Sequence, residues 1–448
     1  MQKLLVFIFA LILSVSTVYA ETIDKTLNKL GINKSAVSVV VKNISTKDTV
    51  YSLNGRTPMH PASTLKLVTT AASVDTLGAD YSFKTSLYKS TNNDLYFKLS
   101  GDPLLSSKNL DKMVKTSRDK KITPKNVYVD DSAFDKVEWG EGWQWDDALN
   151  PLMPKFSVYN LNKNLLKIDA LPTTNGMPAT VSIKPNYPIT CMNYATTNLT
   201  QTSWLKAEKN PEIANTINIL GNVSKSATIY IPLNNPKLNF MLRLADIFKD
   251  SKIEYFGKFT NAKLPKTNIY LVDEVQHGIL PMLGLIIKNS DNLVAESLFK
   301  AAGAEWAEAQ GSFENSKKML DAYFEKLGID AQDIRIVDGS GVSKNNLMTA
   351  DFMANFLVYL SEQEGFENIE MLLPTPSEGT LKNRMLYFKD NLRAKTGTLA
   401  DTSAIAGYIT SKRGKTYAFD IMINDAKTSS ADKKNIEEQI LRSLYMNY

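Results

Sequence analysis

The middle of this 448-residue chain has a different residue pattern from its two ends, and this contrast restricts the possible folds most. Two β-branched runs within residues 36–53 predict a strand pair, and apolar residues at helical spacing predict a helix over about 63–77. From residue 81 to about 264, short alternating runs broken by Asn, Pro, Thr and Ser predict mostly β-structure. Helical runs over 279–302, 313–327 and 351–362, a strand over 391–396, a hairpin and a last helix over 434–446 follow. We therefore expect one α/β domain built from both chain ends and interrupted by a β-rich insert.

The N-terminus carries the features of a secretory signal. Lys3 precedes ten uninterrupted apolar residues, 4–13, and Val18 and Ala20 are compact residues at the positions that a signal peptidase reads. This apolar run is too short to span a bilayer of about 30 Å. We expect residues 1–20 to be removed on export, the alternative being an uncleaved membrane anchor. No later run is long enough to span a membrane, so we expect at most peripheral membrane association.

The composition excludes several classes of function. The formal net charge of +5 is spread along the chain, which argues against nucleic-acid binding. The chain contains only two histidines, His60 and His277, and one cysteine, Cys191. These are too few for a usual zinc site and exclude a disulfide within the chain. We expect no metal or organic cofactor, a structural role for His60, a buried apolar role for Cys191, and catalysis by Ser, Lys, Tyr or carboxylates.

The first candidate site is the pair Ser63 and Lys66 at the start of the predicted helix. Residues i and i+3 share a helix face, so the hydroxyl and the amine can meet. A serine nucleophile needs a base, and lysine can serve if burial or a neighbouring cation lowers its pKa. The alternative is a solvent-exposed helix face, because other Ser-x-x-Lys matches begin at Ser86, Ser117, Ser203 and Ser430.

A second element, Ser290 and Asn292, lies on a predicted loop beside a helix. The Ser290 hydroxyl could relay a proton, and the Asn292 amide could hold a substrate carbonyl or fix Lys66. The alternative is a helix cap, a position at which Ser and Asp are favoured.

The third element is the strand segment Lys395, Thr396, Gly397 and Thr398. The glycine permits close approach of the backbone to a ligand, and the lysine and hydroxyls can bind a carboxylate. The backbone N–H of Thr398 could pair with that of Ser63 as an oxyanion hole. The alternative is an edge strand protected by a lysine.

These three elements, in this order, resemble those of the penicillin-recognising serine enzymes. The long insert makes the chain similar to one family among them, the penicillin-binding protein 4 type D-alanyl-D-alanine carboxypeptidases, or S13 peptidases. Lys344 is a departure, since we expect arginine after the Asp-Gly-Ser-Gly stretch. Four further stretches resemble the same family: residues 101–105, 142–147, 338–343 and 379–385.

The resemblance implies a role for each site residue. Ser63 would be the acylated nucleophile, Lys66 its proton acceptor and Ser290 a proton relay. The substrate-binding residues would be Asn292, Lys395, Thr396 and Thr398, with the N–H groups of Ser63 and Thr398 as the oxyanion hole.

The resemblance also implies the architecture. The fold would be an α/β (α+β) transpeptidase/β-lactamase-like domain, an antiparallel sheet flanked by helices. Its two parts would be residues 21–82 and 268–448, and residues 83–267 would form a mainly-β insert of two small domains.

The implied function is that of a D-Ala-D-Ala carboxypeptidase or D,D-endopeptidase acting on peptidoglycan stem peptides in the periplasm or cell envelope. β-Lactams would be covalent inhibitors. Three alternatives remain: a β-lactamase of the same superfamily, a non-catalytic cell-wall-binding protein and an exported esterase. Trp143 and Trp145 either stack on a sugar or form a packed turn, and the packed turn is favoured.

Overall fold

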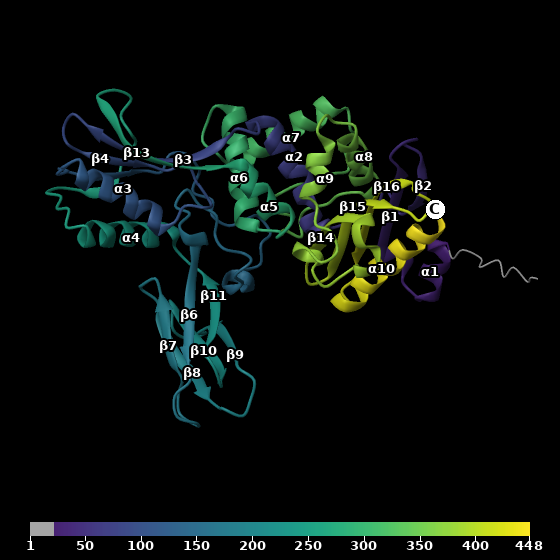
Figure 1. The fold of residues 1–448 in the computed structure, drawn as a ribbon, viewed down its shortest axis with the longest axis horizontal. Coiled ribbons are helices and arrows are strands. Elements are labelled where there is room, and N and C mark those ends of the chain that lie inside the picture. Colours follow the sequence, from purple (N-terminus) through teal and green to yellow (C-terminus); the bar gives the residue numbers. More distant parts are fainter. Residues whose placement is uncertain (1–21) are drawn as a thin grey trace, which may run out of the picture.

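The computed structural model describes residues 22–448, so the predicted export signal lies outside the described residues. One end of the molecule is a β-sheet covered by helices, and the other end is a second sheet with two helices (Figure 1). A smaller β lobe extends to one side between them (Figure 1).

The sheet at the first end joins strands from both ends of the chain. Its strand order is β14-β15-β16-β1-β2, and all its neighbouring pairs are antiparallel. Helices cover both faces, so β1 is buried on both and appears in the sequence as a nearly continuous valine run. The strands are β1 (Val37–Asn43), β2 (Thr49–Leu53), β14 (Leu392–Thr398), β15 (Thr402–Thr410) and β16 (Thr416–Asn424).

Helices form a layer on each face of this sheet. The short α1 and the C-terminal α10 pack on one face, and α8 packs on the other. Behind α8, the helix α2 is surrounded by α5, α6 and α7. The helices are α1 (Ile23–Lys29), α2 (Lys66–Leu77), α5 (Ile279–Ile287), α6 (Asn292–Ala307), α7 (Phe313–Leu327), α8 (Ala350–Ser361), α9 (Phe366–Leu372) and α10 (Ser430–Asn447).

The second five-stranded sheet has the order β12-β5-β4-β3-β13. Its β4 and β5 are parallel, and α3 makes the crossover that parallel strands need. The sequence analysis did not predict α3 or α4. The elements are β3 (Ser82–Ser90), β4 (Leu95–Lys98), α3 (Ser107–Asp119), β5 (Val127–Asp130), α4 (Pro236–Asp250), β12 (Phe259–Asn261) and β13 (Ile269–Gly278).

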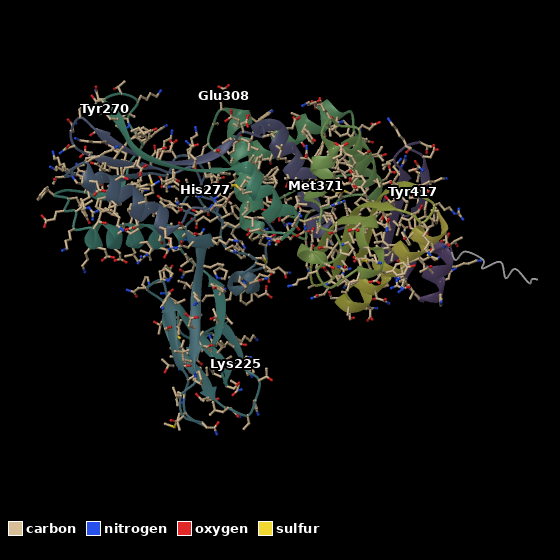
Figure 2. The ribbon with its side chains drawn as sticks, in the orientation of Figure 1. Lys225, Tyr270, His277, Glu308, Met371 and Tyr417 are labelled. Atoms are coloured by element: carbon tan, nitrogen blue, oxygen red, sulfur yellow. The ribbon has the colours of Figure 1, made fainter. Side chains whose placement is uncertain are left out.

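The smaller lobe consists of two three-stranded sheets, ordered β8-β10-β9 and β11-β6-β7, around its own apolar cluster. Lys225 lies on this lobe, far from the helical layer (Figure 2). The strands are β6 (Leu165–Leu171), β7 (Thr180–Lys184), β8 (Thr190–Thr197), β9 (Trp204–Lys209), β10 (Thr216–Val223) and β11 (Ala227–Pro232).

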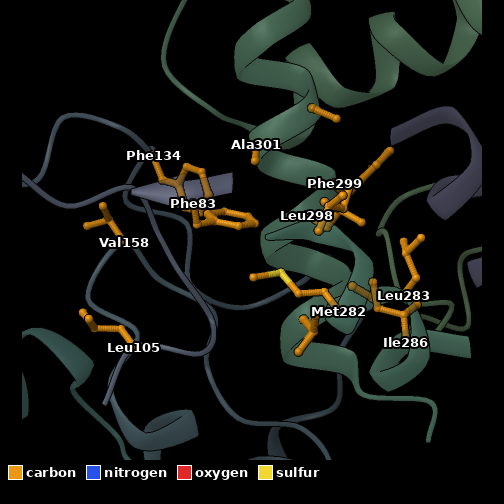
Figure 3. Packing of buried hydrophobic residues seen from close by; sticks show 14 of the residues in the cluster. Phe83, Leu105, Phe134, Val158, Met282, Leu283, Ile286, Leu298, Phe299 and Ala301 are labelled. Carbon is orange, nitrogen blue, oxygen red and sulfur yellow. The ribbon is translucent and has the colours of Figure 1, made fainter. Parts of the chain in front are cut away.

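The largest apolar core runs without a break from the second sheet into the helical layer. Phe83 of β3 and Phe134 lie beside α6, whose Leu298 and Phe299 face α2 and its neighbours (Figure 3). The second sheet is therefore fixed to the helices by a shared core, whereas the lobe has a separate one.

The mixed α/β fold with an antiparallel sheet flanked by helices confirms the predicted fold class. Two local differences concern the site. The helix predicted from residue 63 begins as a 3₁₀ turn, Ala62–Leu65, before α2. The helical run predicted over 279–302 is broken between α5 and α6, where Ser290 adopts a left-handed conformation with φ +59°.

Candidate active site

The tight turn before α2 brings the first two candidate residues together. Ser63 lies in the 3₁₀ turn, and Lys66 is the first residue of α2. The Lys66 Nζ atom lies 3.0 Å from Ser63 Oγ, within hydrogen-bond distance. The spacing predicted from the sequence therefore does place the amine against the hydroxyl.

Lys66 is fully buried and has two further partners. Its Nζ donates to Asn292 Oδ1 at 2.6 Å and to the Ser340 carbonyl at 2.5 Å. Burial lowers the pKa of Lys66 to about 8, although the nearby carboxylates of Asp338 and Glu296 act in the opposite direction. A neutral lysine is therefore accessible near neutral pH.

These contacts also orient the lysine. A neutral amine has two N–H groups and one lone pair, whereas an ammonium group has three donors and no acceptor. The carbonyl oxygens of Asn292 and Ser340 take both N–H groups of the neutral form. The lone pair of Lys66 is then left for the Ser63 hydroxyl, which is the geometry that a general base requires.

A second buried lysine lies beside the first. Lys395 on β14 donates to Ser290 Oγ at 2.9 Å and to the Thr396 carbonyl at 2.8 Å. Burial, and to a smaller extent the charge of Lys66, lowers the pKa of Lys395 well below its usual value. The Ser290 hydroxyl is therefore placed between the Lys395 amine and the cleft.

Most of the candidate residues line one cleft of about 700 Å³, whereas Lys66 and Lys395 are buried behind its wall. Thr396 is fixed there because its Oγ1 donates to Thr380 Oγ1 at 2.7 Å. The predicted residues that line the cleft are Ser63, Ser290, Asn292, Thr396 and Thr398, with Asp146, Asp147, Lys344 and Thr380 on the same walls.

Gly397 allows β14 to lie against the turn that carries Ser63. A Cβ atom at this position would lie 2.8 Å from the Pro61 carbonyl oxygen and 2.9 Å from Ser63 N. Both distances are shorter than real Cβ contacts, so any larger residue would push the strand away from the serine. The close approach predicted for this glycine is thus made to the protein's own backbone.

The two tryptophans of the 143–145 segment differ in exposure. Trp143 is buried, and its Nε1 donates to Asp338 Oδ2 at 2.8 Å. Trp145 is 78% exposed, with the Lys209 ammonium 5.6 Å from its ring centroid. The packed-turn interpretation therefore holds for Trp143 but not for Trp145.

His60 and Cys191, for which the sequence predicted no catalytic role, do not line the cleft. The His60 backbone N–H donates to Asn424 Oδ1 at 2.7 Å, and its Nδ1 lies 3.2 Å from the Asn346 carbonyl, a structural position. Cys191 is half-buried in the lobe. Within residues 22–448, no three His, Cys, Asp or Glu side chains are grouped to hold a metal ion, and no helix is long and apolar enough to cross a membrane.

A family model described as the D-Ala-D-Ala carboxypeptidase 3 (S13) family matches residues 19–445. The chain belongs to this family. It is therefore a serine peptidase of the D-Ala-D-Ala carboxypeptidase type, and the predicted family and enzyme class are confirmed.

Individual S13 relatives extend along most of the chain. The D-alanyl-D-alanine carboxypeptidase of Actinomadura sp. strain R39 is 27% identical over 436 residues, covering 90% of this chain and 80% of the relative. The D-alanyl-D-alanine carboxypeptidase DacB of Haemophilus influenzae is 24% identical and covers 92% and 91%. The crystal structure of penicillin binding protein 4 from H. influenzae has a TM-score of 0.82 at 23% identity, covering 95% of this chain and 99% of that one. This structural likeness confirms the fold.

Sequence reasoning did not assign a role to several residues of the S13 site. Ser340 supplies a carbonyl to Lys66, and Glu296 and Asp338 place buried carboxylates beside it. The stretch 338–343 stood out only by family resemblance, and Glu296 carried no signal beyond its position one turn after Asn292.

Proposed function

We propose that Ser63 is acylated by the penultimate D-Ala of a peptidoglycan stem peptide and that water then hydrolyses the ester. The observation that carries this proposal is the 3.0 Å contact between Ser63 Oγ and the buried Lys66 amine. Neutral Lys66 accepts the hydroxyl proton as the Ser63 oxygen attacks the carbonyl carbon.

The tetrahedral intermediate collapses when the D-Ala nitrogen accepts a proton and leaves. Ser290, hydrogen-bonded to Lys395, passes its hydroxyl proton to that nitrogen and receives in return the proton that Lys66 took from Ser63, so Ser290 and Lys66 both return to their starting states. The N–H groups of Ser63 and Thr398 stabilise the developing oxyanion. Water repeats the same steps on the ester and regenerates free Ser63.

The terminal carboxylate of the substrate binds at the β14 side of the cleft. The bound carboxylate favours the protonated form of the buried Lys395, which then supplies a positive charge there, and Thr396 and Thr398 supply hydroxyl donors. Asn292 holds the substrate amide from the opposite side while its Oδ1 keeps Lys66 in place.

The same site acts on two kinds of substrate and one kind of inhibitor. Cleavage of a D,D cross-link breaks the same bond type, so endopeptidase activity is part of the proposal. β-Lactams present an equivalent carbonyl and carboxylate and acylate Ser63. The N-terminal signal supports export to the periplasm or cell envelope, where this polymer lies.

The decisive experiment incubates residues 21–448 with cross-linked muropeptides and measures released D-Ala and separated peptides by mass spectrometry. We expect release by the wild type and by Ser86→Ala, which removes another Ser-x-x-Lys serine, and none by Ser63→Ala. D-Ala release by Ser63→Ala would remove Ser63 from its role.

A second measurement separates the competing functions. The lifetime of the penicillin acyl-enzyme is long for a carboxypeptidase of this kind and short for a β-lactamase. Absence of any label from fluorescent penicillin would favour a non-catalytic cell-wall-binding protein. Turnover of simple esters without a carboxylate would favour an esterase.

A further inference from the structure

One buried carboxylate next to the site has no part in the steps above. Glu296 lies on α6, one turn after Asn292, and is 3% exposed. Its two oxygens each accept a backbone N–H, Oε2 from Gly339 at 3.1 Å and Oε1 from Ser340 at 2.8 Å. A carboxylate can accept both bonds, whereas an amide of the same shape can accept only one and offers a donor to the other.

The segment that Glu296 holds is the one that touches the catalytic lysine. The Ser340 carbonyl accepts from Lys66 Nζ at 2.5 Å. From the other side, Thr69 Oγ1 on α2 donates to the Gly339 carbonyl at 2.7 Å. The 339–340 backbone is therefore held between α6 and α2, with its last carbonyl directed at the amine.

We propose that Glu296 is a positioning residue that fixes the Ser340 carbonyl against Lys66 and, through its negative charge, sets the pH at which Lys66 can act as a base. This inference rests on the proposed function, because it assumes that Lys66 deprotonates Ser63. Without the Ser340 carbonyl, one N–H of neutral Lys66 has no acceptor, and its lone pair is no longer confined to the Ser63 hydroxyl.

The charges around Glu296 support this coupling. Burial and then the Asp338 carboxylate raise the pKa of Glu296 to about 7, although its hydrogen bonds to Ser340 and Gly339 and the charge of Lys66 act in the opposite direction. Glu296 is therefore mostly ionised at pH 8 and above, where Lys66 becomes neutral. In return, the Glu296 carboxylate raises the pKa of Lys66. Lys300, one turn further along α6, and Glu141 line a cavity of about 180 Å³ together with Glu296 and Asp338.

The other charged groups on this cavity already have partners. The Lys300 Nζ donates to Asp135 Oδ1 at 2.5 Å, and Glu141 lies 3.5 Å from Arg335. The carboxylates whose charges act on Lys66 are therefore Asp338, Glu296 and, with the smallest effect, Asp291, and Lys395 is the basic group that interacts with it. Asp338 accepts four other hydrogen bonds, from Trp143, Gly341, Ser343 and Asn346.

The test measures the second-order rate constant of Ser63 acylation by fluorescent penicillin between pH 6 and 10. Glu296→Gln removes the charge and one acceptor, and Glu296→Asp keeps the charge but shortens the reach. The matched control is Glu437→Gln, because Glu437 is equally buried and accepts from Ser403 and Arg384 on the other side of the sheet. Thermal melting checks folding of each protein.

For Glu296→Gln we expect the pH midpoint of acylation to fall by about one unit, since a nearby negative charge is lost. We also expect its plateau rate to fall by about tenfold or more, since the base is misplaced. Glu296→Asp should keep the wild-type midpoint with a reduced plateau. Glu437→Gln should lower the melting temperature and leave both quantities unchanged.

An unchanged midpoint in Glu296→Gln, or the same shift in Glu437→Gln, would overturn the inference. If Glu296→Gln does not fold, Glu296→Asp decides, and a wild-type plateau in that protein overturns the positioning role. If neither variant folds, Thr69→Val removes the hydrogen bond that holds the 339–340 backbone to α2. An unchanged plateau of the acylation rate in Thr69→Val would then overturn the positioning role. Lack of wild-type labelling would refute the proposed function instead.

Discussion

Burial of the single residue Lys66 sets the pH at which it can act as the proposed base. Its pKa, lowered to about 8 by burial, means that the amine is protonated at pH 6 and largely neutral at pH 9.5. Only the neutral form can accept the Ser63 proton. We therefore expect the rate of acylation by fluorescent penicillin to rise with pH to a midpoint near 8, since second-order rate constants report the free enzyme. A flat profile between pH 6.5 and 9.5 in protein that remains folded would contradict this assignment.

Asp420 is a second buried titratable residue, in the middle of β16. Within residues 22–448, neither of its carboxyl oxygens makes a hydrogen bond of good geometry, and burial raises its pKa well above the usual value. Above about pH 4 the unfolded chain loses this proton while the folded chain keeps it, so stability falls as pH rises.

Asp420→Asn removes this titration. We expect its Tm to fall less than the wild-type Tm between pH 5 and 8, by about 1 °C for each 1 kcal/mol of stability in a chain of this length. Calorimetry at several pH values measures the difference. The exposed Asp48→Asn serves as control and should follow the wild type. Parallel Tm curves for wild type and Asp420→Asn would show that the carboxyl is already ionised in the folded protein.

The sequence was informative about residues that carry a local motif. Ser63 and Lys66 are joined by one turn, and Lys395 and Gly397 by one strand, so their spacing alone predicts which groups can meet. Glu296 and Ser340 meet Lys66 only through long-range packing of α6 and a loop on α2. No local pattern encodes such a contact, which is why the sequence analysis missed both residues.

At the scale of elements, the turn that carries Ser63 depends on a glycine from a distant loop. Gly341 has φ +76°, and a Cβ there would lie 2.0 Å from the Ala62 carbonyl oxygen. We expect Gly341→Ala to push the turn away from Lys66 and to slow acylation about 100-fold, the cost of roughly 1 Å of misplacement.

Gly414→Ala is the matched control for that variant. Gly414 has φ +75° in the β15–β16 turn, but nothing lies within 4 Å of its added Cβ. It therefore carries the same backbone strain of about 1–2 kcal/mol without the clash. Both variants should lose some thermal stability, and only Gly341→Ala should lose acylation. Equal acylation rates would contradict the close-packing argument.

The predicted elements were most accurate where their periodicity was uninterrupted. The helix predicted over 313–327 and the strand over 49–53 agree with α7 and β2 at both ends. The break between α5 and α6 lies at the polar residues 288–292, where the sequence analysis placed Ser290 and Asn292 on a loop although it also predicted a helical run over 279–302. It is produced by the left-handed Ser290 and by Asp291, whose side chain accepts from Val294 N and caps α6.

For the whole molecule, the sequence indicated an interrupted α/β domain but not how the interruption is attached. The β-rich region contains α3 and α4, and its five-stranded sheet shares the main core with the helical layer. A change of residue pattern marks where a chain alters its local structure, not which apolar faces pack together. Within the inserted region, the smaller lobe has a core of its own, built around residues such as Ile168 and Ile219.

Because the smaller lobe has a core separate from that of the second sheet and the helices, we predict that the lobe can be removed. Leu166 and Ile231 are paired neighbours on β6 and β11, so an Asn-Gly hairpin turn can replace residues 167–230. Both flanking residues are changed to Thr, because their core leaves with the lobe. We expect a cooperatively folded protein that acylates with penicillin within about threefold of the wild-type rate, since the hydrogen-bond partners of Lys66 and Lys395 lie outside the lobe, which approaches the cleft where Lys209 contacts Trp145. Phe83→Ala in the shared core is the contrasting variant. It should cost about 3–5 kcal/mol and lower the temperature at which acylation is lost. A lobe-less chain that fails to fold while Phe83→Ala is tolerated would reverse this assignment of the two cores.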